Sequence, residues 1–114
     1  IEQMIRNLVF NAIDAIEGKK EKVLKIALQP ADESKGRNGV LISVADNGIG
    51  LKEEDLPKIF EQFFTTKTPG KGTGLGLAVC YGIVTGYGGE IWAENNDAGG
   101  ATFFISLPVN ERRI

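Results

Sequence analysis

Polar side chains that could bind a metal ion recur along the opening stretch, "IEQMIRNLVFNAIDAIE". Gln3, Asn7, Asn11 and Asp14 are spaced four, four and three residues apart, so a helix would place them on one face. Such a stripe is most often a solvated helix surface. Two asparagines one turn apart are unusual, because Asn is a poor helix former while its amide oxygen is a good ligand for a hard cation. The stripe is therefore either plain surface or a magnesium site that also touches phosphate.

A single carboxylate ends the apolar segment "VLISVAD". Residues 40, 42, 44 and 46 share one face of a strand, so Asp46 is expected to point towards the core with three apolar neighbours. A buried carboxylate must accept hydrogen bonds. Asn47 and Gly48 follow directly, and the partner is therefore either the turn that they form or the amino group of a ligand. Gly50 offers a second point of close backbone approach.

The stretch "GKGTGLGL" at 70–77 is rich in glycine and is followed by apolar residues. A helix that begins here would present unpaired N–H groups, and the glycines would let phosphate oxygens approach. The motif is neither a Walker A loop, because the Gly-Lys-Ser/Thr ending is absent, nor a dinucleotide fingerprint, because no strand precedes it. Lys67 and Lys71 would add positive charge if they are not simply solvated. A flexible linker is the alternative.

The elements that must position these residues are expected along one domain, 1–114. Apolar periodicity predicts helices at 1–17, 52–63 and 75–84, and strands at 22–30, 40–46, 89–95 and 101–108. The first two strands are expected to pair antiparallel. The fold class is then a two-layer α/β (α+β) sandwich, with three helices on one face of a mixed, mostly antiparallel sheet.

The first helix is expected to bury the apolar face formed by Ile1, Met4, Ile5, Leu8, Val9, Ala12, Ile13 and Ile16. No capping residue precedes it, and the chain begins with Ile1 instead of Met. We therefore expect an N-terminally truncated piece of a longer protein.

Composition excludes several classes of function. With 13 Lys+Arg against 15 Asp+Glu, the net charge of −2 does not favour nucleic acid, and no apolar run approaches the ~20 residues of a membrane span. Cys80 is the only cysteine, so an internal disulfide is impossible and a cytoplasmic setting is expected. The absence of histidine removes imidazole bases, His-activated nucleophiles and most zinc sites.

Taken together, the motifs resemble the catalytic, ATP-binding domain of the sensor histidine kinases, within the wider family of gyrase, Hsp90 and MutL and its Bergerat fold. The resemblance covers nearly the whole chain in five blocks: "NLVFNAIDAI" is similar to the N box, "DNGIG" and "GKGTGLGL" to the two glycine boxes, "FEQFFTTK" to the F box, and "GGATF" to the last box. The "TTK" ending is similar to the nitrogen-regulation subgroup.

The resemblance implies roles for individual residues. Asn11 would bind Mg²⁺ with Asn7 beside it as the second catalytic residue, and Asp46 would accept from the adenine amino group. Thr102 would help to hold the adenine through water, while phenylalanines 60, 63 and 64 pack beneath an ATP lid at about 64–74. The implied nucleotide-binding set is Asn7, Asn11, Asp14, Asp46, Gly48, Ile49, Gly50, Phe60, Thr66, Lys67, Lys71, Gly72, Thr73, Gly74, Leu75, Gly76, Leu77 and Thr102. Asp14 stands where many relatives have Lys.

The implied reaction needs partners as well as the cofactors ATP and Mg²⁺. The γ-phosphoryl group would pass to a histidine on a dimerisation domain of the same protein, a homodimer at full length, and then to an aspartate on a response regulator. That histidine is not in this chain, so we expect nucleotide binding without autophosphorylation. The setting is cytoplasmic, including the cytoplasmic part of a membrane-anchored sensor, with no membrane contact by this domain.

Three alternatives share parts of this pattern. An ATP-hydrolysing clamp of the gyrase, Hsp90 or MutL kind would carry a glutamate where this chain has Asn7, because the attacking water needs a base. A docking module that has lost its nucleotide should have lost Asn11, Asp46 or the glycines, and all are present. A serine kinase of the anti-sigma type is disfavoured by "FEQFF".

Overall fold

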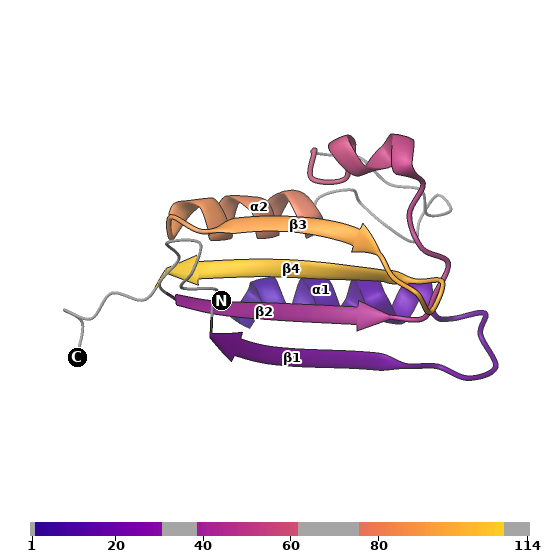
Figure 1. Ribbon diagram of the computed structural model, residues 1–114. Coiled ribbons are helices and arrows are strands. Elements are labelled where there is room, and N and C mark those ends of the chain that lie inside the picture. The colour runs from indigo at the N-terminus through magenta and orange to yellow at the C-terminus, as the bar shows by residue number, and fades with distance from the viewer. Residues whose placement is uncertain (1, 31–38, 62–75, 109–114) are drawn as a thin grey trace.

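The protein is described from a computed structural model, which covers residues 2–30, 39–61 and 76–108. In chain order these residues form α1 (Glu2–Ala15), β1 (Leu24–Pro30), β2 (Gly39–Asp46), the short 3₁₀ helix η2 (Glu53–Lys58), α2 (Gly76–Gly86), β3 (Glu90–Asn95) and β4 (Ala101–Pro108). Figure 1 shows the strands side by side, with α1 and α2 behind them.

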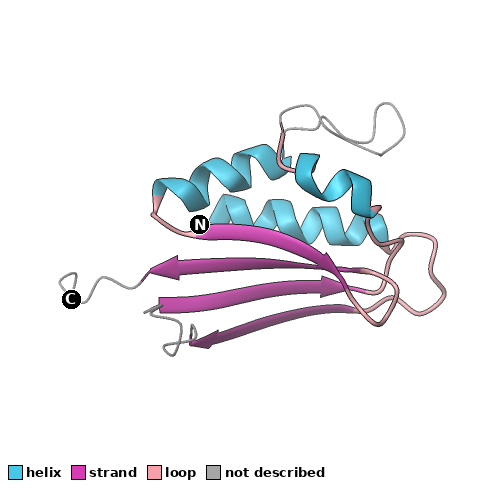
Figure 2. Ribbon diagram, turned by 45° about the horizontal axis from the view of Figure 1, so that its top comes forward, coloured by secondary structure: helices cyan, strands magenta, loops and turns pink. Residues whose placement is uncertain are grey.

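The four strands form one sheet in the order β1-β2-β4-β3. Every neighbouring pair runs antiparallel, including the predicted pair β1 and β2. Figure 2 shows both α-helices on the same face of the sheet, which gives two layers. The predicted two-layer α/β class is confirmed, although the described part of the sheet is wholly antiparallel and contains no parallel pair.

The core lies between the helices and the inner face of the sheet. Along α1 and the turn that follows it, the buried residues Met4, Leu8, Ala12 and Ile16 recur every fourth position, as one helical face requires. On β2 and β4 burial alternates with period two, and the register pairs Val44 with Phe103 across the strands. The central cluster comprises Met4, Leu8, Ala12, Ile42, Val44, Ile59, Cys80, Val84, Ala101, Phe103 and Ile105.

The helix predicted at 52–63 is present, but in the described residues it is shorter than predicted. The segment forms a 3₁₀ helix of six residues with Pro57 inside it, and Asp55 N donates to Lys52 O three residues back at 2.9 Å. Proline has no N–H to donate to an α-helical ladder, which explains the tighter and shorter turn. The described residues therefore hold two α-helices and one 3₁₀ helix. Ile59, which follows η2, is still buried as predicted.

The other boundaries differ slightly from the prediction. α1 ends at Ala15 and continues as a turn, and Ile13, predicted on the apolar face, is 47% exposed. α2 begins at Gly76 and runs to Gly86. No helix within 2–30, 39–61 and 76–108 has the length and apolar character of a membrane span.

Candidate functional site

Asp46 is the one buried charged or polar side chain among the described residues, with 4% of its surface exposed. Its Oδ1 accepts hydrogen bonds from Gly48 N at 2.8 Å and from Ala101 N at 3.3 Å. Among the described residues both bonds to this carboxylate go to Oδ1, which leaves Oδ2 able to accept from a ligand. The carboxylate therefore holds its own turn and also has the capacity for a ligand, so the two interpretations from the sequence are compatible.

Glycines make room for backbone around this carboxylate. A Cβ on Gly48 would overlap the carbonyl oxygen of Ala15, and a Cβ on Gly100 would overlap the carbonyl oxygen of Asp46. Gly50 has a φ of 73°, in the region that favours glycine, and a Cβ there would lie 2.9 Å from Gly99 O. The sequence analysis identified Gly48 and Gly50 as site residues but missed Gly100, whose signal was its place before the predicted last strand.

Helix α1 connects the Asp46 turn with the start of α2. At its C-terminal end, Ala15 O accepts from Ile49 N at 3.2 Å, so the turn caps the helix. Two turns earlier, Asn7 Nδ2 donates to Gly76 O at 3.4 Å, at the first residue of α2. The eight residues between these contacts span about 12 Å of helix. Asn7 and Asp46 thus belong to opposite ends of one site lined by α1.

Asn11 lies between those ends, one turn from each, and its side chain is half-buried. Gln3 and Asp14 are exposed, so only the two middle residues of the predicted polar stripe, Asn7 and Asn11, are half-buried. In the part of the chain that the structure describes, no three His, Cys, Asp or Glu side chains gather as a metal site. A metal here would depend on the Asn11 amide oxygen and on oxygens of a bound ligand.

Two further asparagines, which the sequence analysis did not select as site residues, hold the loop after Asp46. Asn47 accepts from Val23 N at 2.9 Å and donates to Glu21 O at 2.8 Å. Asn95 accepts from Leu51 N and donates to Leu51 O, both at 2.7 Å. Each amide forms hydrogen bonds with backbone groups of a segment that is distant in the sequence. Together the two side chains hold both ends of the "DNGIG" turn.

Thr102 lies on the opposite face of the sheet from Asp46. It pairs with Ala45 in the register of β2 and β4, and side chains of paired residues share a face. Its hydroxyl accepts from Asn96 Nδ2 at 3.1 Å. Within the last box, Ala101 donates its backbone N–H to the Asp46 carboxylate, and Gly100 packs against the Asp46 backbone. The contact of Thr102 with adenine through water stays a prediction.

The other predicted residues of the site divide into two groups. Ile49 is 78% exposed, Leu77 is half-buried against the core, and the Phe60 ring lies 6.0 Å from that of Tyr81 and 6.3 Å from that of Phe103. Phe60 therefore ties the segment after η2 to α2 and the sheet. The remaining predicted positions fall outside the described residues: Phe63, Phe64, Thr66, Lys67, Lys71, Gly72, Thr73, Gly74 and Leu75.

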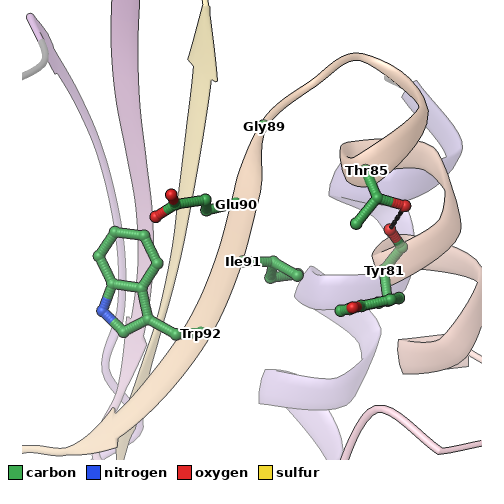
Figure 3. Close-up of a pocket in the computed structure, with 6 residues that line it drawn as sticks. All are labelled: Tyr81, Thr85, Gly89, Glu90, Ile91 and Trp92. Atoms are coloured by element: carbon green, nitrogen blue, oxygen red, sulfur yellow. Dashed lines mark hydrogen bonds between the residues drawn. The ribbon is translucent and has the colours of Figure 1, made fainter. Parts of the chain in front are cut away.

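A separate cavity of about 500 Å³ lies at the free edge of the sheet. Figure 3 shows β3 between two groups of side chains, with Glu90 and Trp92 on one side and Ile91 facing Tyr81 and Thr85 of α2 on the other. Glu90 pairs with Ser106, at the end of β4 away from Ala101. This cavity contains none of the predicted nucleotide residues, so we place the functional site at Asp46.

Known proteins resemble this chain over nearly its whole length. Residues 1–111 match the family model described as "Histidine kinase-, DNA gyrase B-, and HSP90-like ATPase". The chain is 37% identical to the sensor histidine kinase TmoS of Ectopseudomonas mendocina over 96% of its length, and 42% identical to the sensor histidine kinase ZraS of Escherichia coli K12 over 99%. It spans only 11% of TmoS and 22% of ZraS.

Solved structures show the same fold. The catalytic domain of the histidine kinase ThkA superposes with a TM-score of 0.77 at 39% identity, over 94% of this chain and 64% of that one. Full-length ShkA in complex with AMPPNP superposes with a TM-score of 0.70 at 27% identity, over 94% of this chain and 22% of that one.

Proposed function

The chain belongs to the histidine kinase-, DNA gyrase B- and HSP90-like ATPase family, and on that premise we propose that it binds Mg²⁺-ATP as the catalytic domain of a two-component sensor histidine kinase. The phosphoryl acceptor is a histidine on a separate dimerisation domain, in a protein that is a homodimer at full length. A response-regulator aspartate receives the group next. Support comes from the relatives named as sensor histidine kinases and from ShkA, which was solved with AMPPNP.

The observation that carries the nucleotide proposal is the environment of Asp46. A carboxylate that is 4% exposed has its Oδ1 bonded to two backbone N–H groups, and its Oδ2 can accept from an amino group. Gly48, Gly50 and Gly100 keep side chains away from the surrounding backbone. Adenine carries its amino donor at C6 of the six-membered ring, where guanine carries a carbonyl acceptor, and the amino group of guanine is at C2. A single acceptor that meets the group at C6 therefore suits adenine.

We assign the metal to Asn11. Mg²⁺ is usually held by one or two protein oxygens together with phosphate and water oxygens, so one half-buried amide is a sufficient protein contribution. When bound, the ion would neutralise part of the phosphate charge. The start of α2 would face the same phosphates with its unpaired N–H groups. Asn7, bonded to Gly76 O, would keep α1 and α2 at a fixed distance on either side.

The chain contributes positioning and electrostatics, and the reacting nucleophile comes from the partner domain. A clamp that hydrolyses ATP needs a base near the attacking water, and the side chain one turn before Asn11 is the neutral amide of Asn7. An amide has no useful basicity near neutral pH. This favours transfer to a protein acceptor over the gyrase-like, Hsp90-like or MutL-like alternative, and the sensor-kinase relatives favour it over a serine kinase.

The proposal is tested by titrating the 114-residue chain with a fluorescent ATP analogue in Mg²⁺. Asp46→Asn should weaken binding about 10- to 100-fold, because it removes a charged acceptor of a hydrogen bond worth about 1.5–3 kcal/mol. Asp97→Asn makes the same chemical change at an exposed carboxylate of the β3–β4 turn and should bind as the wild type does. Equal affinity for wild type and Asp46→Asn would refute the adenine assignment.

The metal assignment is tested in the same titration. Asn11→Ala should flatten the dependence of ATP affinity on Mg²⁺ concentration, since the only proposed protein ligand is lost. An unaltered Mg²⁺ titration in Asn11→Ala would show that the ion is held elsewhere.

A further inference from the structure

The side chain of Asn96 uses its full hydrogen-bonding capacity. Its Nδ2 donates to the carbonyl oxygen of Asp46 at 3.0 Å and to Thr102 Oγ1 at 3.1 Å. Its Oδ1 accepts from Ala98 N at 3.0 Å and Gly100 N at 3.1 Å. An asparagine amide offers two donors and two acceptor sites, so all four are occupied. Because carbonyl and hydroxyl oxygens surround one end and N–H groups the other, the orientation of the amide is fixed.

The two ends of this amide serve different parts of the fold. Through Oδ1 it closes the turn between β3 and β4, which is also held by Asn96 N donating to Gly100 O at 2.9 Å. Through Nδ2 it reaches β2, 50 residues earlier in the chain, at Asp46. Asn96 is part of the turn and forms a hydrogen bond to Asp46, and it therefore links the turn to the strand end that carries the buried carboxylate.

The link bears on the geometry of the carboxylate itself. Gly100 packs so closely on Asp46 that a Cβ would overlap its backbone, and the next residue, Ala101, donates its N–H to Asp46 Oδ1 at 3.3 Å. If the turn moves relative to Asp46, that N–H moves with it. Oδ1 would then lose one of its two partners, and the carboxylate could rotate about its terminal torsion, which is soft for Asp.

We propose that Asn96 is a positioning residue for base recognition: by tying the β3–β4 turn to the Asp46 carbonyl, it keeps the Asp46 carboxylate oriented to accept from the adenine amino group. This inference rests on the proposed function, since it presumes that Asp46 reads the base. The competing view is that Asn96 only closes its turn, in which case its loss lowers stability but not the discrimination between bases.

Asn96→Asp separates these two views. The variant keeps an oxygen that accepts from Ala98 N and Gly100 N, so the turn is preserved, but it loses both donors and places a second oxygen opposite the Asp46 carbonyl. It also adds a negative charge. Ala98→Asp is the matched control, because it adds the same charge to the same exposed turn and leaves both Nδ2 bonds in place.

The readout is the ratio of Kd values for GTP and ATP, measured on the 114-residue chain with fluorescent analogues in Mg²⁺. We expect the wild type and Ala98→Asp to prefer ATP strongly, and Asn96→Asp to lose at least tenfold of that preference. In NMR spectra, the Gly48 and Ala101 amide resonances should shift in Asn96→Asp more than in Ala98→Asp. If Asn96→Asp does not fold, Asn96→Gln, which is neutral and one methylene longer, should reduce the ratio likewise.

A ratio in a folded Asn96 variant within twofold of the wild-type ratio would overturn the inference, as would an equal loss in Ala98→Asp. In either case ATP binding by the wild type would leave the proposed function standing. A wild-type chain that binds neither nucleotide would overturn the proposed function, and the inference with it.

Discussion

At the scale of single residues, the candidate site depends on glycines that leave room for neighbouring backbone as much as on the Asp46 carboxylate. Gly100 lets the β3–β4 turn lie directly on Asp46, and Gly48 lets the next turn lie on the end of α1. The carboxylate then receives two backbone N–H groups, from Gly48 and from Ala101, which are 53 positions apart in the sequence. The same few residues are therefore needed both for the stability of the fold and for the proposed binding of a ligand at Asp46.

Gly100→Ala should destabilise the chain by about 2–4 kcal/mol, because its Cβ would meet backbone that can move only with the sheet. It should also weaken ATP binding through Asp46. Gly82→Ala lies inside α2, where no packing neighbour among the described residues comes within 4 Å of the added Cβ, and it is expected instead to stabilise by about 0.5–1 kcal/mol. Urea unfolding of both variants measures the difference, and a Gly100→Ala chain as stable as Gly82→Ala would contradict the close contact.

At the scale of elements, the site depends on how α1 packs against α2. Cys80 of α2 is fully buried and donates its thiol to Met4 O of α1 at 3.5 Å, three residues before Asn7. Burial raises the pKa of the Cys80 thiol to about 11, and a hydrogen bond from the Asn7 side chain offsets part of that effect. Cys80 is part of the buried core cluster, so its side chain fills space between the helices and the sheet.

The raised pKa of Cys80 predicts a loss of stability at high pH. The folded chain keeps the thiol proton, whereas an unfolded Cys, with a pKa of 9.0, releases it. The stabilisation is therefore complete below about pH 9 and is lost as the pH rises towards 11, for a total of about 2–3 kcal/mol. Free energies of unfolding at pH 8 and pH 10.5 should fall more steeply in the wild type than in Cys80→Ala. Parallel slopes would show that the thiol does not contribute.

At the scale of the whole molecule, the chain carries the proposed nucleotide site but no phosphoryl acceptor of the histidine type, since it contains no histidine. Its two layers place α1, α2 and the Asp46 turn around one region, while the outer face of the sheet is not covered by the described helices (Figure 2). The chemistry that we propose therefore depends on a second domain reaching this region.

Mixing the chain, Mg²⁺-ATP labelled at the γ position and a separately prepared dimerisation domain of the same protein should give acid-labile phosphohistidine on that domain. Asp46→Asn should reduce the initial rate at subsaturating ATP by about the same factor as it reduces affinity. Omission of the dimerisation domain is the control, and the chain alone should stay unlabelled. Rapid release of inorganic phosphate with no labelled histidine would favour the ATPase clamp instead.

The sequence alone determined the features that depend on near neighbours. Period-four apolar residues specified α1, period-two alternation aimed Asp46 at the core, and a set of short motifs indicated the family, because each pattern is local and survives without knowledge of the rest of the chain. The same locality limits what the pattern can specify. Apolar spacing predicted a helix over 52–63 but not its kind, and the described residues form a six-residue 3₁₀ helix that contains Pro57.

Only the tertiary structure decided which distant residues complete the site. The register of β2 and β4 puts Ala101 N–H, not the Thr102 side chain, on the Asp46 carboxylate, and it brings Asn96 to the Asp46 carbonyl. Asn95 reaches Leu51 in the same way. Such contacts join residues about 50 positions apart in the sequence. Local sequence patterns do not predict them, because they form only when the strands pair and the sheet packs against α1.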